Sequence, residues 1–304
     1  MSYPLVSIAL CTYNGEHYLV EQLDSLVTQT YQNLEIIVVD DLSRDNTLAI
    51  AENYARRYPI IKIYQNTENL GYNKNFEKAI SLCKGELIAL SDQDDIWDIT
   101  KIAIQVEHIK DNMLIYHDSE LIDENGKSLN NFVFNICNPY RGRDPRNFIL
   151  GNCVSGHTVL FKRDLIKYMG SFPKELHYDQ WLAYVATSIG KIDYLNLALV
   201  KFRRHNSNST DILRQNKTRA NVKNMDLEEW RKLNHFFNYK HSLISKFLNE
   251  LIYLARQKKI FGFNFRLFNF LFKYKYVLLS TSKKSSLSKL NYLFKYTSKL
   301  TEKR

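Results

Sequence analysis

The sequence predicts an α/β protein with a mainly parallel central sheet, and three observations support this. Short apolar runs such as residues 5–10 (LVSIAL) and 34–39 (LEIIVV) have the length and β-branched content of buried strands. The segments between them carry apolar residues at helical spacing, and each apolar run ends in a polar turn. Strands that alternate with helices form parallel sheets through right-handed crossovers.

The first hundred residues give the clearest alternation. We expect strands at 5–10, 34–39, 60–64 and 87–90, separated by helices at 16–29, 46–58 and 73–84. Ser43, Asp45 and Asn46 are candidate caps for the second helix, which Pro59 ends. Gly85 stops the third helix.

Beyond Trp97 the pattern loosens. We expect a helix at 99–109, a short strand at 113–116, a turn at Asn125-Gly126, a loop at 130–147 and a strand at 155–161. A helix at 179–189 and strands at 191–195 and 198–202 follow.

Composition limits the class of protein. The chain has 304 residues and is 45% hydrophobic, enough for a real core. The first ten residues lack a basic leader segment, and no run of 18 apolar residues occurs, so we expect neither a signal peptide nor a membrane span. The four cysteines are scattered, which favours buried thiols over a metal or disulfide motif.

The net charge of +10 is unevenly distributed. Residues 201–304 hold 24 Lys and Arg against 6 Asp and Glu, whereas residues 1–200 hold 18 against 26. An acidic first part indicates a site that uses a cation, and a basic last part indicates contact with an anionic partner. We expect two parts, a first domain at 1–215 and a basic, helical, aromatic-rich extension at 216–304.

The extension is amphipathic and dense in Phe and Tyr. Its charges make it a poor membrane span but suit the surface of an anionic bilayer. The alternatives are a helical hairpin packed on the catalytic domain and a homo-oligomer formed through the extension. A nucleic-acid-binding protein is a third reading of the basic tail, but no recognised module is present and the acidic first part would repel phosphate, so we expect no nucleic-acid partner.

Residues 86–97 (ELIALSDQDDIW) join an apolar run to three carboxylates, Asp92, Asp94 and Asp95. Carboxylates packed this closely repel one another unless a cation lies among them. Hard oxygen ligands suit Mg²⁺ or Mn²⁺ better than Zn²⁺. The alternative is a solvated acidic turn ahead of the next helix.

Polar residues follow three predicted strands, at 12–14, 40–41 and 92–95. The ends of parallel strands lie at one edge, so these loops can converge on one ligand. The chain has neither a GxGxxG segment after its first strand nor a GxxxxGK[ST] segment, which argues against dinucleotide oxidoreductases and P-loop NTPases. We expect a nucleoside-diphosphate ligand held by carboxylates and a cation.

Six motifs in order, TYN, VVDDLSRDNT, NLGYNKN, SDQDDIW, YDQW and RRHNSN, resemble glycosyltransferase family 2, whose members have the GT-A fold. The SDQDDxW form looks most like the rhamnosyltransferase-like members. The resemblance covers about residues 5–210, and its strength lies in the order and spacing of all six motifs.

The resemblance implies roles for individual residues. Asp179 would be the catalytic base, and Asp94, Asp92 and His205 would bind Mg²⁺ or Mn²⁺. The nucleotide-sugar donor would be bound by residues of the first four motifs and their neighbours: Cys11, Thr12, Tyr13, Asn14, Glu16, Asp41, Asn75, Asp92 and Trp97.

The sequence departs from the family pattern at three positions. Leu42 replaces the glycine usual after the paired acids, so that turn and the contacts of Ser43 are expected to differ. Cys11 replaces a more usual Pro or Thr near the base, and Gln180 stands where relatives often carry an aromatic residue.

The implied activity is inverting transfer of a sugar from a UDP- or dTDP-sugar, dTDP-rhamnose among them. The acceptor would be a hydroxyl of a surface polysaccharide or a lipid-linked oligosaccharide, at the cytoplasmic face of the cell membrane. The alternative is a non-catalytic nucleotide-sugar-binding or scaffolding subunit of a polysaccharide assembly complex.

Overall fold

The computed structural model describes residues 3–205, 225–257 and 263–300. In its first part strands and helices alternate as expected: β1 (Val6–Thr12), α1 (Leu19–Val27), β2 (Leu34–Asp40), α2 (Thr47–Arg57), β3 (Ile61–Gln65), α3 (Tyr72–Leu82) and β4 (Leu87–Ser91). β1 pairs in parallel with both β2 and β4, and β2 with β3. The predicted parallel sheet is therefore confirmed, and the carboxyl ends of β1, β2 and β4 lie at one edge.

The first strands are buried because their side chains are apolar on both faces. Val38 and Val39 are fully covered, one in each of the two main core clusters. Gly85 precedes β4 where a Cβ atom would lie 2.6 Å from the backbone nitrogen of Ser7. Only glycine allows this close approach of two neighbouring segments.

The second half of the sheet differs from the expectation. The sheet order is β3-β2-β1-β4-β8-β6-β9-β5, with β7 (Ser128–Phe132) paired to β6. β6 (Leu114–Ile122) runs six residues past the predicted strand end because its polar residues are buried along β9. β9 (Ile192–Arg203) is one bulged strand where we expected two, and β5 (Ile96–Trp97) was not expected.

The predicted strand at 155–161 was wrong over most of its length. Residues Gly156–Thr158 form a 3-10 turn, η3, and only β8 (Leu160–Lys162) is a strand. Thr158 closes the turn, donating from its backbone nitrogen and from its hydroxyl to the carbonyl of Ser155. The predicted loop at 130–147 contains two further 3-10 turns, η1 (Val133–Asn135) and η2 (Pro145–Phe148). Two more helices, α4 (Lys101–Ile109) and α6 (Tyr178–Ile189), lie where helices were expected.

A short connection links β8 to α6. It is formed by η4 (Arg163–Leu165) and α5 (Ile166–Met169). The chain then turns at Gly170 and reaches the amino end of α6 at His177.

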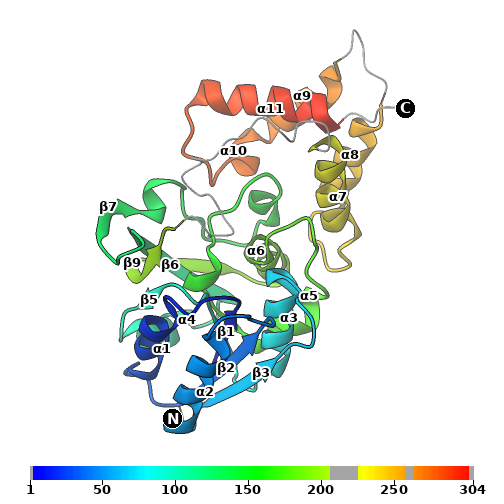
Figure 1. Ribbon diagram of the computed structural model, residues 1–304. Helices are drawn as coiled ribbons and strands as arrows, with labels where there is room; N and C mark the ends of the chain where they lie inside the picture. The colour runs from blue at the N-terminus through cyan, green and yellow to red at the C-terminus, as the bar shows by residue number, and fades with distance from the viewer. Residues whose placement is uncertain (1–2, 206–224, 258–262, 301–304) are drawn as a thin grey trace.

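The C-terminal helices gather at one end of the molecule (Figure 1). They are α7 (Met225–Asn238), α8 (Ser245–Ala255), α9 (Phe265–Lys273), α10 (Lys275–Leu278) and α11 (Ser286–Leu300). Their buried side chains belong to the same apolar cluster as those of α6. Tyr184 of α6, for example, packs on Phe236 of α7 at 4.6 Å between ring centroids. The predicted domain boundary at 215/216 falls outside the described residues.

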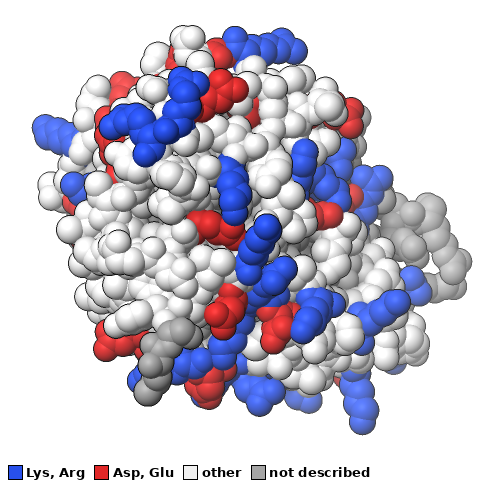
Figure 2. Space-filling model, turned by 90° about the horizontal axis from the view of Figure 1, so that it is seen from below, with Lys and Arg blue, Asp and Glu red and all other residues white. Residues whose placement is uncertain are grey.

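Among the described ranges, no helix combines the length and apolarity needed to cross a bilayer. Figure 2 shows the face turned away from the C-terminal helices. There, Lys and Arg side chains are interspersed with Asp and Glu.

Candidate active site

A cleft of about 810 Å³ opens at the carboxyl ends of β1, β2 and β4. Ten of the predicted site residues line it: Cys11, Thr12, Tyr13, Asn14, Asp41, Asn75, Asp92, Asp94, Asp179 and His205. Residues more than 190 positions apart in the sequence therefore share one cavity. The roles predicted for these residues remain predictions.

Two predicted residues do not line the cleft. Trp97 is buried in the core, and the Lys101 ammonium lies 3.1 Å from the centroid of the Trp97 ring. The Glu16 carboxylate accepts hydrogen bonds from the backbone and side-chain nitrogens of Asn46, at 2.9 and 2.7 Å. It thereby supports the start of α2, where a negative charge interacts favourably with the helix dipole.

The loop after β2 is held by hydrogen bonds to Asp40. The carboxylate accepts from the hydroxyl of Thr12 at 3.0 Å and from the backbone nitrogen of Ser43 at 2.9 Å. Leu42 has a φ of 64°, a left-handed conformation that glycine adopts without strain. A leucine here therefore adopts a backbone conformation that favours glycine, and the Ser43 hydroxyl accepts from the backbone nitrogen of Asn14 at 2.9 Å.

Asp41 is almost fully buried beside this turn and organises the start of α3. Its carboxylate accepts from the Asn66 amide at 2.6 Å and from the backbone nitrogens of Leu70 and Gly71, both at 2.8 Å. Gly71 has a φ of 78°, which permits the chain to turn into the helix. Asn75 then donates to the carbonyl of Val39 at 2.9 Å.

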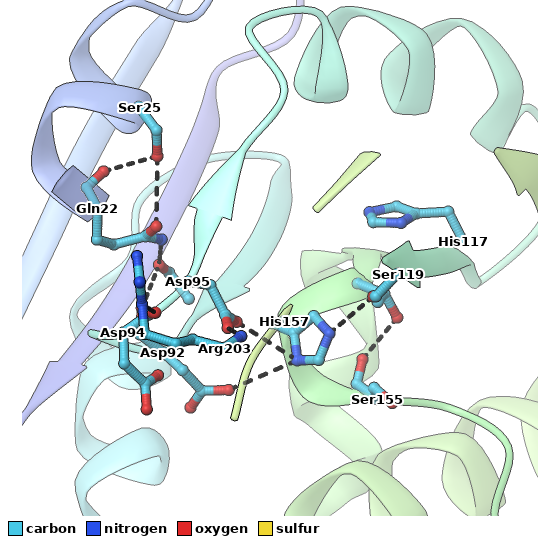
Figure 3. A network of polar contacts seen from close by, with 12 residues as sticks. Gln22, Ser25, Asp92, Asp94, Asp95, His117, Ser119, Ser155, His157 and Arg203 are labelled. Carbon is cyan, nitrogen blue, oxygen red and sulfur yellow. Dashed lines mark hydrogen bonds and ion pairs between the residues drawn. The ribbon is translucent and has the colours of Figure 1, made fainter. Parts of the chain in front are cut away.

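The loop after β4 holds its acids very differently (Figure 3). Burial, with the charges of Asp94 and Asp179, raises the pKa of Asp92 to about 8. Burial and the charges of Asp94 and Asp92 raise the pKa of Asp95 well above its ordinary value. Asp95 accepts one hydrogen bond, at 3.1 Å from the backbone nitrogen of Arg203. Among the described residues, its second carboxylate oxygen is buried without a hydrogen-bond donor.

Arg203, at the end of β9, supports the acidic loop and was not predicted as a site residue. Its buried guanidinium donates to the backbone carbonyls of Asp94 at 2.9 Å and Glu124 at 3.0 Å. It also donates to the carboxylate of Glu21 in α1 at 2.6 Å. The only sequence signal was the basic pair ahead of His205, which does not reveal that this side chain is buried.

Gln93, within the acidic motif, was also missed. Its amide accepts from the backbone nitrogen of Tyr13 at 2.8 Å and donates to the Tyr13 carbonyl at 3.0 Å. This two-way bond joins the loops after β1 and β4. Tyr13 itself is exposed in the cleft.

Two groups of side chains have the chemistry of a divalent-cation site. The Nε2 atom of His205 lies 2.8 Å from a carboxylate oxygen of Asp94, and both side chains are accessible from the cleft. Deeper in, Nδ1 of His157 lies 3.6 Å from Asp95 and 3.8 Å from Asp92. Oxygen and imidazole donors of this kind suit Mg²⁺ or Mn²⁺. Because Asp95 and His157 are almost fully buried, the Asp94–His205 pair is better placed to contact a ligand.

His157 bridges the acidic loop to β6. Its Nε2 atom lies 2.8 Å from the hydroxyl of Ser119. Burial lowers the pKa of its imidazole to about 3, so the ring is neutral near neutral pH. No sequence motif assigned a role to His157.

Asp179 lies in the first turn of α6, as predicted. Its carboxylate accepts from the Asn152 amide at 3.0 Å and from the backbone nitrogen of Gln180 at 2.6 Å. Burial raises its pKa above the ordinary value. An acid that is fixed in place, faces a cleft and has a raised pKa has the properties of a general base.

Comparisons with known proteins agree on one family. The family model described as "Glycosyl transferase family 2" matches residues 7–169. An uncharacterized glycosyltransferase of Rickettsia typhi is 33% identical over 68% of this chain and 66% of its own length. One from Haemophilus influenzae is 28% identical over 72% of each chain. An uncharacterized glycosyltransferase of Rickettsia felis is matched over 37% of its own length. The chain therefore spans less than two thirds of the length of each of these two Rickettsia relatives.

Among solved structures, Staphylococcus aureus TarS in complex with UDP-GlcNAc superposes with a TM-score of 0.61 at 19% identity. The match covers 90% of this chain and 81% of TarS. TarS in complex with UDP gives a TM-score of 0.57 at 20% identity, over 81% of this chain and 69% of that one. These likenesses identify the fold.

Proposed function

The chain belongs to glycosyltransferase family 2 and has the GT-A fold, and from this premise we propose that it is an inverting, divalent-metal-dependent enzyme. The observation that carries the proposal is the meeting of Asp41, Asp92, Asp94, Asp179 and His205 around one cleft. Inverting transfer needs a base on the acceptor side and neutralisation of the departing diphosphate.

The proposed reaction is a single displacement. Asp179 accepts the proton of an acceptor hydroxyl while that oxygen forms a bond to the anomeric carbon of the donor sugar. The bond from this carbon to the diphosphate oxygen breaks, and the nucleoside diphosphate leaves with the bonding electrons. The hydrogen bonds from Asn152 and the Gln180 backbone keep the carboxylate oriented for this step.

Asp94 and His205 would hold Mg²⁺ or Mn²⁺, with Asp92 on the cleft side. A bound cation would supply positive charge for the diphosphate. The donor set fits this use, since a carboxylate oxygen and an imidazole nitrogen 2.8 Å apart can bind one ion together. The mutual repulsion of the acids in this loop gives a second reason for a cation there.

We propose a UDP- or dTDP-sugar as donor, with dTDP-rhamnose suggested by the SDQDDIW motif. Tyr13, Asn14 and Asp41 would line the nucleoside pocket, beside Cys11 and Thr12. The Asp41 carboxylate already accepts three hydrogen bonds from the protein, so a bond from the nucleotide base would be its fourth. The acceptor is proposed to be a polysaccharide or a lipid-linked oligosaccharide, at the cytoplasmic face of the cell membrane.

Release of nucleoside diphosphate from candidate donors tests the enzyme against the scaffolding alternative. We expect slow hydrolysis of at least one UDP- or dTDP-sugar, with water replacing the acceptor. In Asp179→Asn the rate should fall roughly 10²–10⁴-fold, because the general base is lost, while stabilisation of the protein by nucleotide persists. Asp164→Asn, at an exposed acid paired with Lys167, is the matched control.

Two results would reject this account. Hydrolysis of no donor, despite nucleotide binding, would favour the scaffolding subunit. An unchanged rate in Asp179→Asn would assign the base to another residue.

A further inference from the structure

Two C-terminal helices expose apolar side chains on their outer side. In α9, Phe265 is 54% exposed and Phe272 41% exposed, whereas Leu267, Phe270 and Leu271 are buried. In α11, Leu287 is 80% exposed and Phe294 50% exposed, whereas Leu293, Tyr296 and Leu300 are buried. We call the outward-facing set the outer apolar face: Phe265, Phe268, Phe272, Leu287, Leu290 and Phe294. In each helix its members follow the spacing i, i+3, i+7, so they share one side of the helix.

The aromatic part of this face is continuous between the helices. The ring of Phe294 lies 6.3 Å from that of Phe268, centroid to centroid. Phe263 stacks on Phe294 at 4.5 Å and also contacts Phe265 at 5.0 Å. Phe268 and Phe272 stack at 6.1 Å. An exposed apolar patch of connected aromatic rings is a feature of interaction surfaces.

The segment that carries this face has charged residues of one sign. Residues 251–301 contain eleven Lys and Arg and no Asp or Glu. Exposed Arg266, Lys273 and Lys295 lie on the same two helices, and the Lys275 ammonium lies 3.5 Å from the centroid of the Phe272 ring. The opposite face of the molecule, in contrast, mixes both signs (Figure 2).

We propose that the outer apolar face docks on the surface of an anionic lipid bilayer. Phenyl rings and leucines would enter the boundary between headgroups and acyl chains, and the lysines and arginines would bind the anionic headgroups. A second copy of the chain fits less well, since pairing two such faces would bring together two sets of positive charge with no acid among residues 251–301. None of the residues of the outer apolar face lines the cleft, so this surface is separate from the proposed reaction.

Vesicle flotation of the full chain tests the proposal. We compare phosphatidylcholine vesicles with vesicles that contain about 40 mol% phosphatidylglycerol, since the attraction requires anionic lipid. The wild type should float with the anionic vesicles only, and binding should weaken as salt rises, because salt screens the attraction. In the triple variant Phe265→Ser, Phe272→Ser and Phe294→Ser, the affinity for anionic vesicles should fall by roughly tenfold or more.

A matched triple variant controls for the loss of exposed apolar area in general. Ile99→Ser, Leu129→Ser and Leu197→Ser replace side chains of the catalytic part that are 43–51% exposed, and binding should be unchanged. An unchanged melting temperature in each variant shows that its fold is kept.

Three results would overturn the proposal. They are the absence of wild-type binding to anionic vesicles, equal binding by the two triple variants, and a wild-type dimer that the Phe variants convert to a monomer without any vesicle binding. The last result would make this face a contact between copies of the chain.

Discussion

Two acidic loops lie at the same edge of the sheet, on either side of the loop after β1, and their carboxylates have opposite kinds of surroundings. Asp40 and Asp41, after β2, accept hydrogen bonds from backbone nitrogens, a hydroxyl and amide groups of the protein. The loop after β4 packs Asp92, Asp94 and Asp95 together. There the pKa of Asp92 rises to about 8, and one oxygen of Asp95 meets no hydrogen-bond donor in the part of the chain that the structure describes.

The difference indicates what each loop is for. A carboxylate satisfied by the protein's own donors fixes the shape of the backbone around it. A group of carboxylates that repel one another stores an unfavourable interaction that a cation can remove. We therefore expect the first loop to shape the pocket and the second to bind a charged group from outside the chain.

Loss of Arg203 should produce the largest effect on stability, because this side chain ties the second loop to α1 and to the turn at Glu124. Arg203→Leu would remove the hydrogen bonds to the Asp94 and Glu124 carbonyls and the ion pair with Glu21. We expect it to lower the free energy of unfolding by about 2–4 kcal/mol, measured by urea denaturation, because several hydrogen bonds are lost together. Lys201→Leu, at an exposed position of the same strand, is the control. A loss below about 1 kcal/mol for Arg203→Leu would show that the loop is held by other contacts.

Asp41→Asn tests the loop after β2, whose carboxylates are hydrogen-bonded by the protein itself, and should have an intermediate effect on stability. The amide of asparagine offers one acceptor oxygen where the carboxylate uses two for the Asn66, Leu70 and Gly71 donors. We expect a loss of about 1–3 kcal/mol in unfolding free energy, of the same size with and without Mn²⁺. If Mn²⁺ restored the lost stability, the two loops would not differ in the way described.

Leu42→Gly should produce the smallest effect. Because Leu42 holds a φ of 64°, glycine relieves strain worth about 1–2 kcal/mol but loosens the unfolded chain. Stability should therefore change by less than about 1 kcal/mol, whereas Leu42→Val, which places a β-branched residue at positive φ, should lose more. Urea midpoints in the reverse order would mean that side-chain packing of Leu42 outweighs its backbone conformation.

Local sequence patterns predicted the strands and loops of the first half of the sheet. Periodicity placed β1, β2 and β4, and the parallel arrangement of these strands brings Thr12, Asp41 and Asp94 to one edge. These inferences need only neighbours in sequence and one rule of sheet geometry.

Pairing between strands that are distant in the sequence could not be predicted from local patterns. β6 runs through polar residues such as His117 and Asp118, which are buried because β9, some 80 residues later, pairs alongside. For the same reason neither the burial of Arg203 nor the position of His157 against the acidic loop could be foreseen. Trp97 was expected in the donor pocket from its motif, but it pairs with β9 in a short strand and is buried in the core instead of lining the cleft.

A thermal-shift measurement with UDP, dTDP, GDP and CMP, each with and without Mn²⁺, tests most directly whether the acidic loop binds a nucleotide through a cation. We expect UDP or dTDP to raise the melting temperature markedly more with Mn²⁺ than without it, since a ligand that binds only the folded state stabilises it by mass action. In Asp94→Asn, whose ligand oxygen pairs with His205 in the wild type, the Mn²⁺-dependent part should vanish while the protein alone melts no earlier. Equal shifts with and without Mn²⁺, or an Asp94→Asn protein that keeps the Mn²⁺ response, would contradict the account.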